Sequence, residues 1–213
     1  METILTGDGS VTCYNRAYQE SYHSITGAAE EAVRKYAIPC LAGIKGAVRI
    51  LDICFGLGYN SAAAIDYLNG IPAEITCLEK DPEILRMIQD MSPPFRSYHL
   101  IRELALRGHI RTGRTKMELI IGPAEETVRR SGTGFDAVFL DPFSPKKNPE
   151  LWTILFLKDV GKKMKPGGIL ATYSCARQVR DNLACAGFEV SDGPRVRRRG
   201  PSTIARKIYK VGT

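Results

Sequence analysis

The stretch 48–60, which reads VRILDICFGLGYN, constrains the fold more than any other part of the chain. Its apolar run carries one acid near the end, Asp52, and leads into a turn that contains Gly56 and Gly58. Asn60 then begins an alanine-rich segment. Glycines let a backbone approach a ligand closely, and the first turn of a helix presents unpaired N–H groups. The stretch predicts a strand, a ligand-binding turn and a helix, and the alternative is a tight turn in an ordinary α/β sheet.

A second acid follows the next apolar run. Residues 75–78 are apolar and lead to Glu79 and Lys80, and Glu79 stands 21 positions after Gly58. At about 20 residues from the glycine turn, an acid on the second strand meets the hydroxyls of a ribose. The dehydrogenase spacing G-x-G-x-x-G is not present, because Ser61 stands where the third glycine is expected. The two stretches together predict the nucleoside-binding half of an α/β sheet.

From residue 48 onward, apolar runs alternate with helical stretches, which predicts a mostly parallel sheet with helices on both faces. We expect seven strands, near 48–53, 74–78, 117–121, 136–140, 168–173, 187–191 and 204–210. We expect helices near 60–69, 82–90, 97–107, 123–130, 150–164 and 175–185. Ligands of such sheets bind at the carboxyl ends of the strands, so the loops that begin there are the candidate site.

Residues 1–45 are expected to form an extension over the active site, and residues 46–213 the main domain. Two short apolar runs around a glycine-containing turn, 3–5 and 11–14, predict a hairpin. Residues 27–38 predict a helix that ends before a proline.

The segment 18–24 contains two tyrosines, a histidine and two serines, which is too polar for a core. We interpret it as a lid over the pocket, and a surface loop is the alternative.

The segment 135–145, FDAVFLDPFSP, is the second strong signal. A predicted strand runs directly into Asp141, and the prolines that follow stiffen the turn and place Asp141 and Phe143 at the carboxyl edge of the sheet. A carboxylate beside an aromatic ring suits a flat substrate that bears an amine, because the ring can stack on a base and the acid can bind the amine. The alternative is a plain turn in which Asp141 caps backbone N–H groups.

Basic residues cluster in two places, and the formal net charge is +7. The stretch from Gly193 onward has seven cations and no acid: Arg195, Arg197, Arg198, Arg199, Arg206, Lys207 and Lys210. Residues 96–116 carry six cations and Glu103 alone as an acid. Such clusters suit a polyanion, because binding releases counterions. A solvated basic face is the alternative.

We expect a cytoplasmic protein with no membrane segment. Residues 1–10 lack the basic flank and apolar core of a secretory signal, and no apolar run approaches the roughly 20 residues that span a bilayer. None of the six cysteines forms a C-x-x-C pair, so we expect reduced thiols and no metal site.

Four blocks share one resemblance. They are YHS followed by GAAEEA from residue 22, LDICFGLGYNS, FDAVFLDPFSPKKNPELWT and KPGGILATYS. The second block resembles the first motif of class I S-adenosylmethionine methyltransferases, whose sheet is Rossmann-like. Together the blocks resemble the methyltransferase half of the bacterial tRNA 5-methylaminomethyl-2-thiouridine biosynthesis protein. The resemblance implies transfer of a methyl group from S-adenosylmethionine to the aminomethyl nitrogen of 5-aminomethyl(-2-thio)uridine at the tRNA wobble position.

The resemblance also assigns roles to residues. It implies catalytic roles for Asp141, Phe143 and Tyr22. It implies donor binding by Asp52, Cys54, Gly56, Gly58, Asn60, Glu79, Lys80, Glu125 and Asp141. For tRNA it implies His23, Ser24, Lys146, Lys147 and Asn148, to which the basic cluster adds Arg195, Arg197, Arg198 and Arg199.

The chain departs from the family pattern in three ways. Cys54 stands where the first motif has its first glycine, and Pro123 stands where an acid often follows Gly122, which leaves Glu125 as the nearest acid. The flavin oxidase half is not part of the sequence, so we expect no flavin and a separate enzyme that supplies the aminomethyl uridine. We expect a monomer.

Two other functions compete. A polyamine aminopropyltransferase shares the sheet and the carboxylate after the fourth strand, but it needs an acidic pocket, and Lys146 and Lys147 argue against one. A basic α/β module that binds RNA without turnover is the second. Binding of S-adenosylmethionine separates the module from the enzymes.

Overall fold

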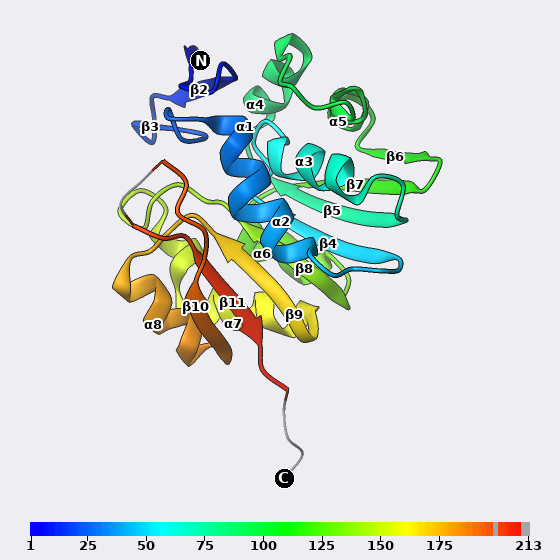
Figure 1. Ribbon diagram of the computed structural model, residues 1–213. Coiled ribbons are helices and arrows are strands. Elements are labelled where there is room, and N and C mark those ends of the chain that lie inside the picture. Colours follow the sequence, from blue (N-terminus) through cyan, green and yellow to red (C-terminus); the bar gives the residue numbers. More distant parts are fainter. Residues whose placement is uncertain (198–199, 210–213) are drawn as a thin grey trace.

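The computed structural model describes residues 1–197 and 200–209 (Figure 1). It contains two sheets. The smaller one is antiparallel and has the order β1-β2-β3, with β1 (Glu2–Leu5), β2 (Val11–Asn15) and β3 (Glu20–Ser21). The predicted hairpin is therefore present, and a short third strand is added to it.

The larger sheet has eight strands in the order β10-β11-β9-β8-β4-β5-β7-β6. The five central strands are parallel, which agrees with the predicted α/β class, and the edges add antiparallel pairs. The strands are β4 (Val48–Ile53), β5 (Ala73–Glu79), β6 (His109–Thr112), β7 (Thr115–Ile121), β8 (Phe135–Leu140), β9 (Met164–Thr172), β10 (Phe188–Asp192) and β11 (Thr203–Lys207).

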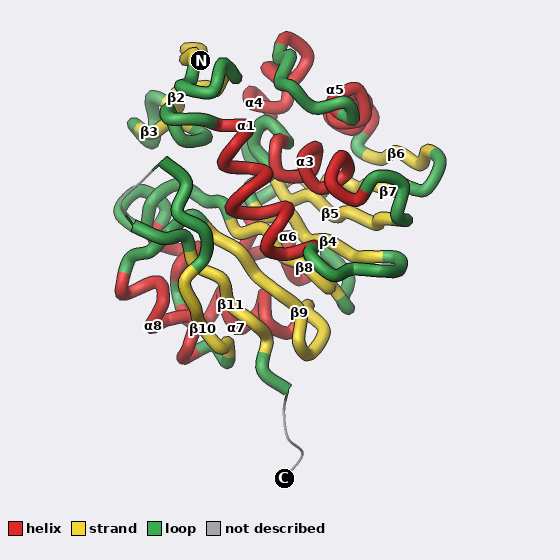
Figure 2. Tube along the Cα trace, in the orientation of Figure 1, coloured by secondary structure: helices red, strands yellow, loops and turns green. Residues whose placement is uncertain are grey.

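Helices cover both faces of this sheet, as predicted (Figure 2). One face packs on α1 (Ala28–Glu31), the π-helix η1 (Ala32–Ala37), α2 (Ile38–Leu41), α3 (Tyr59–Leu68), α4 (Pro82–Met87), the 3-10 turn η2 (Ile88–Asp90) and α5 (Tyr98–Arg107). The other packs on α6 (Ala124–Arg130), the 3-10 turn η3 (Pro149–Trp152), α7 (Ile154–Lys163) and α8 (Arg177–Cys185). The consecutive elements α1, η1 and α2 form the first helix of the chain. Its buried residues belong to the same core cluster as those of β4 and β5.

The prediction of seven strands was wrong, because β6 is an eighth. Among its four residues only Ile110 is buried, so the strand has too little apolar alternation to be recognised. It is an edge strand whose exposed Arg111 belongs to the basic stretch 96–116, and charge on an edge strand discourages pairing with other chains.

The helix predicted to end before Pro39 continues to Leu41. A proline inside a helix lacks an N–H group, and its ring collides with the carbonyl four residues earlier. The wider turn of the π-helix η1 ends at Ala37, two residues before Pro39, and accommodates both defects. The helix predicted over 150–164 is likewise divided, since Thr153 caps α7 through a bond from the N–H of Phe156 to its hydroxyl.

Pro166 and the two glycines after it lie within β9, where the pairing with β8 shifts register. Within residues 1–197 and 200–209, no helix is both long enough and apolar enough to cross a membrane.

Candidate functional site

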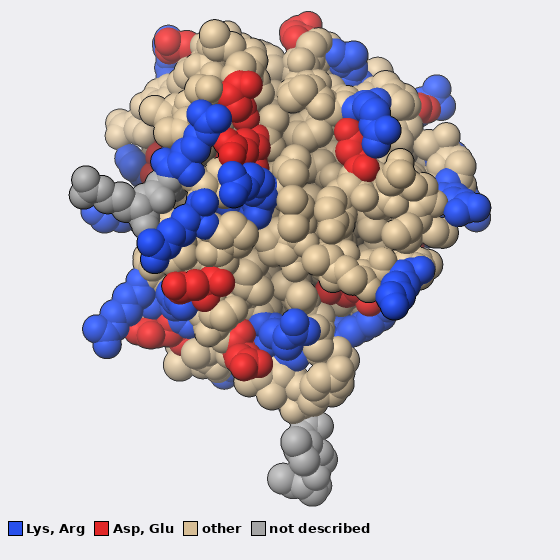
Figure 3. Space-filling model, viewed as in Figure 1, with Lys and Arg blue, Asp and Glu red and all other residues tan. Residues whose placement is uncertain are grey.

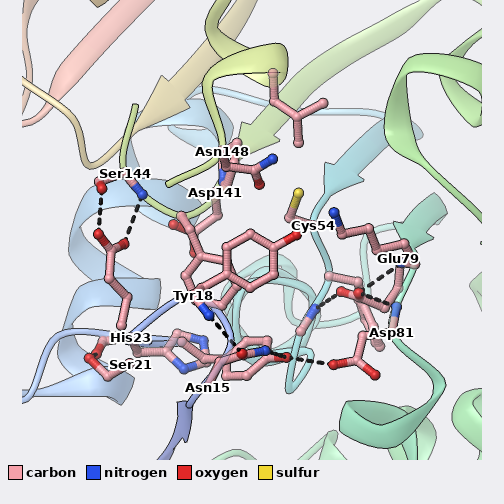
Figure 4. Close-up of a pocket in the computed structure, with 18 of the residues that line it drawn as sticks. Asn15, Tyr18, Ser21, His23, Cys54, Glu79, Asp81, Asp141, Ser144 and Asn148 are labelled. Atoms are coloured by element: carbon pink, nitrogen blue, oxygen red, sulfur yellow. Dashed lines mark hydrogen bonds between the residues drawn. The ribbon is translucent and has the colours of Figure 1, made fainter. Parts of the chain in front are cut away.

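A cavity of about 510 Å³ lies at the carboxyl ends of the central strands. Its walls come from the turn after β4, the end of β5, the loops after β7 and β8, and the N-terminal segment 14–25. In Figure 4, Asp141 and Asn148 lie on one side of the cavity, and Glu79 and Asp81 lie on another. The N-terminal segment therefore closes a site that the sheet alone would leave open.

The turn after β4 is in the left-handed backbone region at Cys54 (φ 65°), Gly56 (φ 55°) and Gly58 (φ 74°). Cys54 thus adopts the conformation that glycine favours, which explains how it replaces the first glycine of the motif. A Cβ atom on Gly56 would lie 3.2 Å from the ring of Tyr22, which also lines the cavity. Gly58 serves packing, because a Cβ atom there would lie 2.4 Å from Ile101.

Glu79 ends β5 and is buried. One carboxylate oxygen accepts the N–H of Gly56 at 2.8 Å, and the other accepts the N–H groups of Lys80 and Asp81, each at 2.8 Å. Burial raises the pKa of Glu79, and these three bonds oppose the rise. The acid therefore fixes the turn after β4 to the end of β5 while it lines the cavity.

Asp141 follows β8 and faces the cavity between two other side chains. Its Oδ1 accepts a 2.6 Å bond from the hydroxyl of Tyr36, and its Oδ2 accepts a 2.9 Å bond from Nδ2 of Asn60. Burial raises the pKa of Asp141 to about 7, the negative charge of Glu31 adds to the rise, and the bonds from Tyr36 and Asn60 oppose it. A carboxyl group with this pKa can accept or release a proton near neutral pH.

Asp52, Gly58 and Asn60 do not line the cavity. Asp52 is fully buried behind it and accepts a 2.6 Å bond from Ser61. Burial raises the pKa of Asp52 to about 8, so the group is protonated near neutral pH. Asn60 reaches the cavity only through Asp141.

Phe143 was expected to offer its face to a base, but in the structure Tyr18 is stacked on Phe143, with ring centroids 4.5 Å apart. The ammonium of Lys80 lies 5.1 Å from the centroid of the Tyr18 ring. The edge of Tyr22 also packs on Phe143, and the Tyr22 hydroxyl bonds Asn15 and Asp81 on the β5 side. Tyr18 was not singled out from the sequence.

The segment 18–24 is bound to the loop after β8. Both carboxylate oxygens of Glu20 accept bonds from Ser144, one from its N–H and one from its hydroxyl. Lys147 donates a 3.0 Å bond to Gln19. These contacts hold the segment over the cavity.

The expectation that segment 18–24 is too polar for a core was wrong at His23 and Ser24, which are buried. His23 shares a 3.2 Å bond with the hydroxyl of Thr12 and stacks on Tyr59, with ring centroids 4.6 Å apart. Burial lowers the pKa of His23 to about 4, so the ring is neutral. Local partners satisfy these polar groups, which is how polar residues are buried.

The basic residues predicted to contact tRNA are dispersed. Lys146, Lys147 and Arg195 are exposed outside the cavity. Arg197 forms an ion pair with Glu30 and donates to the carbonyl of Gly7. Arg198, Arg199 and Lys210 lie outside the described residues. Figure 3 shows cations interleaved with acids on both sides of this view.

The cavity itself is acidic. Of the described residues that line it, six bear a carboxyl group and one bears an ammonium group, Lys80. The six acids are Glu20, Glu31, Glu79, Asp81, Glu125 and Asp141. Sequence reasoning missed Glu20, Glu31 and Asp81, and it also missed Tyr36, the partner of Asp141. An acidic cavity beside a nucleoside-type turn suits a cationic ligand that carries a ribose.

Comparisons with known proteins agree with this geometry. Residues 88–208 match the model of a family described as S-adenosyl-L-methionine-dependent methyltransferases. The crystal structure of MNMC2 from Aquifex aeolicus superposes with a TM-score of 0.84 at 33% identity, over 96% of this chain and 69% of that one.

Two curated relatives are longer proteins. One is the bifunctional tRNA 5-methylaminomethyl-2-thiouridine biosynthesis protein MnmC of Paracidovorax citrulli. It is 33% identical over 86% of this chain, and the match spans 32% of the length of MnmC. An uncharacterised protein of Methanocaldococcus jannaschii is 32% identical over 96% of this chain and 59% of its own. The resemblance to the methyltransferase half of MnmC is confirmed, and with it the methyl donor. The chain belongs to the family of S-adenosyl-L-methionine-dependent methyltransferases.

Proposed function

We propose that this methyltransferase acts on tRNA and transfers the methyl group to the aminomethyl nitrogen of 5-aminomethyl(-2-thio)uridine at the wobble position. The observation that carries the proposal is the position of Asp141. This acid, which has a pKa of about 7, lies in one acidic cavity with the turn after β4 and with Glu79. Relatives named for the same modification support the choice of substrate.

The residues present fit the donor, which is a cation with a ribose and an adenine. Gly56 keeps its wall of the cavity clear, because any Cβ atom there would crowd Tyr22. Glu79 has lone pairs beyond its three backbone bonds and is placed to accept ribose hydroxyls. Lys80 and Glu125 complete this side. When bound, the donor supplies a sulfonium methyl group, whose bond to sulfur breaks with the electron pair left on sulfur.

Asp141 manages the proton of the acceptor. An alkylamine is mostly protonated near neutral pH and has no lone pair with which to attack a methyl group. The Asp141 carboxylate takes one proton from the ammonium, the freed lone pair forms the new N–C bond, and the product is a secondary ammonium. Asp141 then releases its proton to solvent. Tyr36 and Asn60 hold the carboxylate in place throughout.

The exposed cations supply affinity for tRNA. Lys146 and Lys147 lie in the loop after β8, which begins at Asp141, and Arg195 lies in the basic stretch from Gly193 onward. Phosphate contacts of this kind position a nucleic acid without reading its sequence. A separate enzyme of the cytoplasm would supply the aminomethyl uridine.

A second candidate has an observation in its favour. The acidic lining of the cavity contradicts the argument from Lys146 and Lys147 that no acidic pocket is present, since both lysines lie outside the cavity. Acidic walls also suit a polyamine, so an aminopropyltransferase has to be tested beside the tRNA enzyme.

The test is a single-turnover assay with methyl-labelled S-adenosylmethionine and two tRNA preparations, one with aminomethyl uridine and one with unmodified uridine. Label in methylaminomethyl uridine of the first preparation alone, identified by nucleoside analysis, supports the proposal. A parallel assay offers decarboxylated S-adenosylmethionine and a diamine. Transfer to the diamine with no label in either tRNA would replace the proposal with the aminopropyltransferase.

A further inference from the structure

A buried ion pair lies in the first helix next to the cavity. The Nζ atom of Lys35 lies 2.5 Å from Oε1 of Glu31, and the two residues are 2% and 6% exposed. Oε2 of Glu31 accepts a 2.7 Å bond from the N–H of Ser24. Glu31 lines the cavity, whereas Lys35 lies behind it. The mechanism above uses neither residue.

The π-helix η1 orients this pair toward Asp141. The i→i+5 bonds of η1 widen the turn, so Glu31, its N-cap residue, and Tyr36 within it point in directions closer to each other than they would in an α-helix. In an α-helix they would point about 140° apart. Tyr36 donates to Asp141, which places the Glu31 carboxylate beside the same group. π-turns are rare, and they occur frequently at functional sites.

Glu31 retains capacity to bind a ligand. A carboxylate has about four lone pairs, and the known bonds to Glu31 come from Lys35 and Ser24. An ammonium group has three donors, more than the free lone pairs of Asp141 alone serve well, because Tyr36 and Asn60 already bond that carboxylate. A cavity with two adjacent carboxylates therefore binds a protonated amine better than one.

We propose that Glu31 is the second carboxylate of the acceptor subsite: it binds the protonated aminomethyl group beside Asp141, and Lys35 is the positioning residue that holds the Glu31 side chain in place. The inference rests on the proposed function, because it assigns that acceptor to a place in the cavity. Proton transfer remains with Asp141, and Glu31 acts only by binding.

Charged and titratable groups surround Asp141 from every element around it. They are Glu31, Lys35 and Tyr36 of the first helix, Asp52 and Cys54 of β4 and its turn, Glu79 of β5, and Tyr173 after β9. After burial, the charge of Glu31 raises the pKa of Asp141, and the charge of Lys35 lowers it. The two members of the pair therefore have opposite effects on the pH at which Asp141 becomes a base.

The test uses the whole protein with aminomethyl tRNA at saturation, so that phosphate contacts do not hide the effect. Single-turnover methyl transfer is measured from about pH 5 to 9 for Glu31→Gln, Lys35→Met and the double variant. We expect Glu31→Gln to lower the rate about 10- to 100-fold. It should also move the acid limb of the pH–rate profile, where the rate falls as the pH drops, to lower pH, because the charge that raises the pKa of Asp141 is lost. Lys35→Met should move the acid limb to higher pH.

Donor affinity, measured by calorimetry, should stay within threefold in all three variants. Glu30→Gln is the matched control, because Glu30 is the neighbouring acid and pairs with Arg34 and Arg197 instead of lining the cavity. The double variant replaces a buried ion pair with a neutral pair of similar size, so it should fold even if a single variant does not.

A double variant with the wild-type rate would overturn the inference. It would also be overturned if both single variants moved the acid side of the pH–rate profile in the same direction by the same amount. Weaker donor binding in Glu31→Gln would also overturn it, because Glu31 would then belong to the donor. Failure of the proposed function is distinguishable, since the wild-type protein would then not methylate aminomethyl tRNA at all.

Discussion

Glu79 and Asp141 occupy equivalent places, because β5 and β8 lie on either side of β4, Glu79 is the last residue of β5 and Asp141 directly follows β8. Their partners differ. Glu79 is bound by three backbone N–H groups, two of which belong to the next two residues. Asp141 is bound by side chains 105 and 81 positions earlier in the chain. The donor side is thus built mainly from local backbone, and the acceptor side from distant side chains that substitution can remove singly.

The contrast between a donor side at Glu79 and an acceptor side at Asp141 would be wrong if Asp141 only stabilised the turn after β8. We expect Asp141→Asn to lower single-turnover methylation by roughly 10²–10⁴, the range for a positioned acid–base group. Because the pKa of Asp141 is about 7, wild-type activity should fall as the pH drops below that value. Raising the pH should partly rescue the variant, since more of the amine is then already neutral. Activity within threefold of wild type at every pH would leave Asp141 a structural role.

A substitution on the donor side, at Glu79, should weaken the binding of S-adenosylmethionine. Glu79→Gln keeps the shape of the side chain but loses its charge and part of its bonding to the turn after β4. We expect S-adenosylmethionine to bind about 10- to 100-fold more weakly, which corresponds to the loss of about 1–3 kcal/mol from bonds to a charged group. Calorimetric titration measures this effect. Unchanged donor affinity, together with a lower melting temperature, would show that Glu79 only fixes the turn.

Asp52 belongs to β4, the strand between β5 and β8, and it should affect the stability of the protein and its dependence on pH. Its pKa is about 8 in the fold and near 4 in an unfolded chain. Between these values the folded form retains a proton that the unfolded form has lost, so this contribution to stability is present below about pH 4 and is lost as the pH rises to 8. Asp52→Asn should therefore gain several degrees in melting temperature relative to wild type between about pH 5 and 8. A difference that does not grow with pH would contradict the assignment.

The smallest expected effect concerns the basic surface. Arg195 is exposed, whereas Arg197 is paired with Glu30. Arg195→Ala should reduce the slope of log affinity for tRNA against log salt by about one unit. Arg197→Ala is the control and should change the slope less, while it lowers stability by about 0.5 kcal/mol, typical of an exposed ion pair. Equal changes in slope would show that the ion pair opens when tRNA binds.

The sequence predicted most of what local backbone builds. The turn after β4 and the place of Glu79 follow from glycine spacing and from an acid at a strand end, and Asp141 follows in the same way. What Asp141 contacts could not be predicted, because Tyr36 belongs to a helix whose rotation depends on a π-turn. Likewise, the stacking of Tyr18 on Phe143 joins residues 125 positions apart, and no local pattern encodes such a contact.

The position of β11 has a consequence for synthesis. It lies between β9 and β10, and it is the only strand paired with β10 among those the structure describes. As the chain leaves the ribosome, β10 emerges first and waits with its backbone groups unpaired until Lys207 has been made. During that interval the edge of β9 and the ring of Phe188, which is 2% exposed in the fold, are open to other chains. A chain that ended before Thr203 would retain every cavity-lining residue, but the edge of β9 would be unpaired and could form hydrogen bonds with other chains.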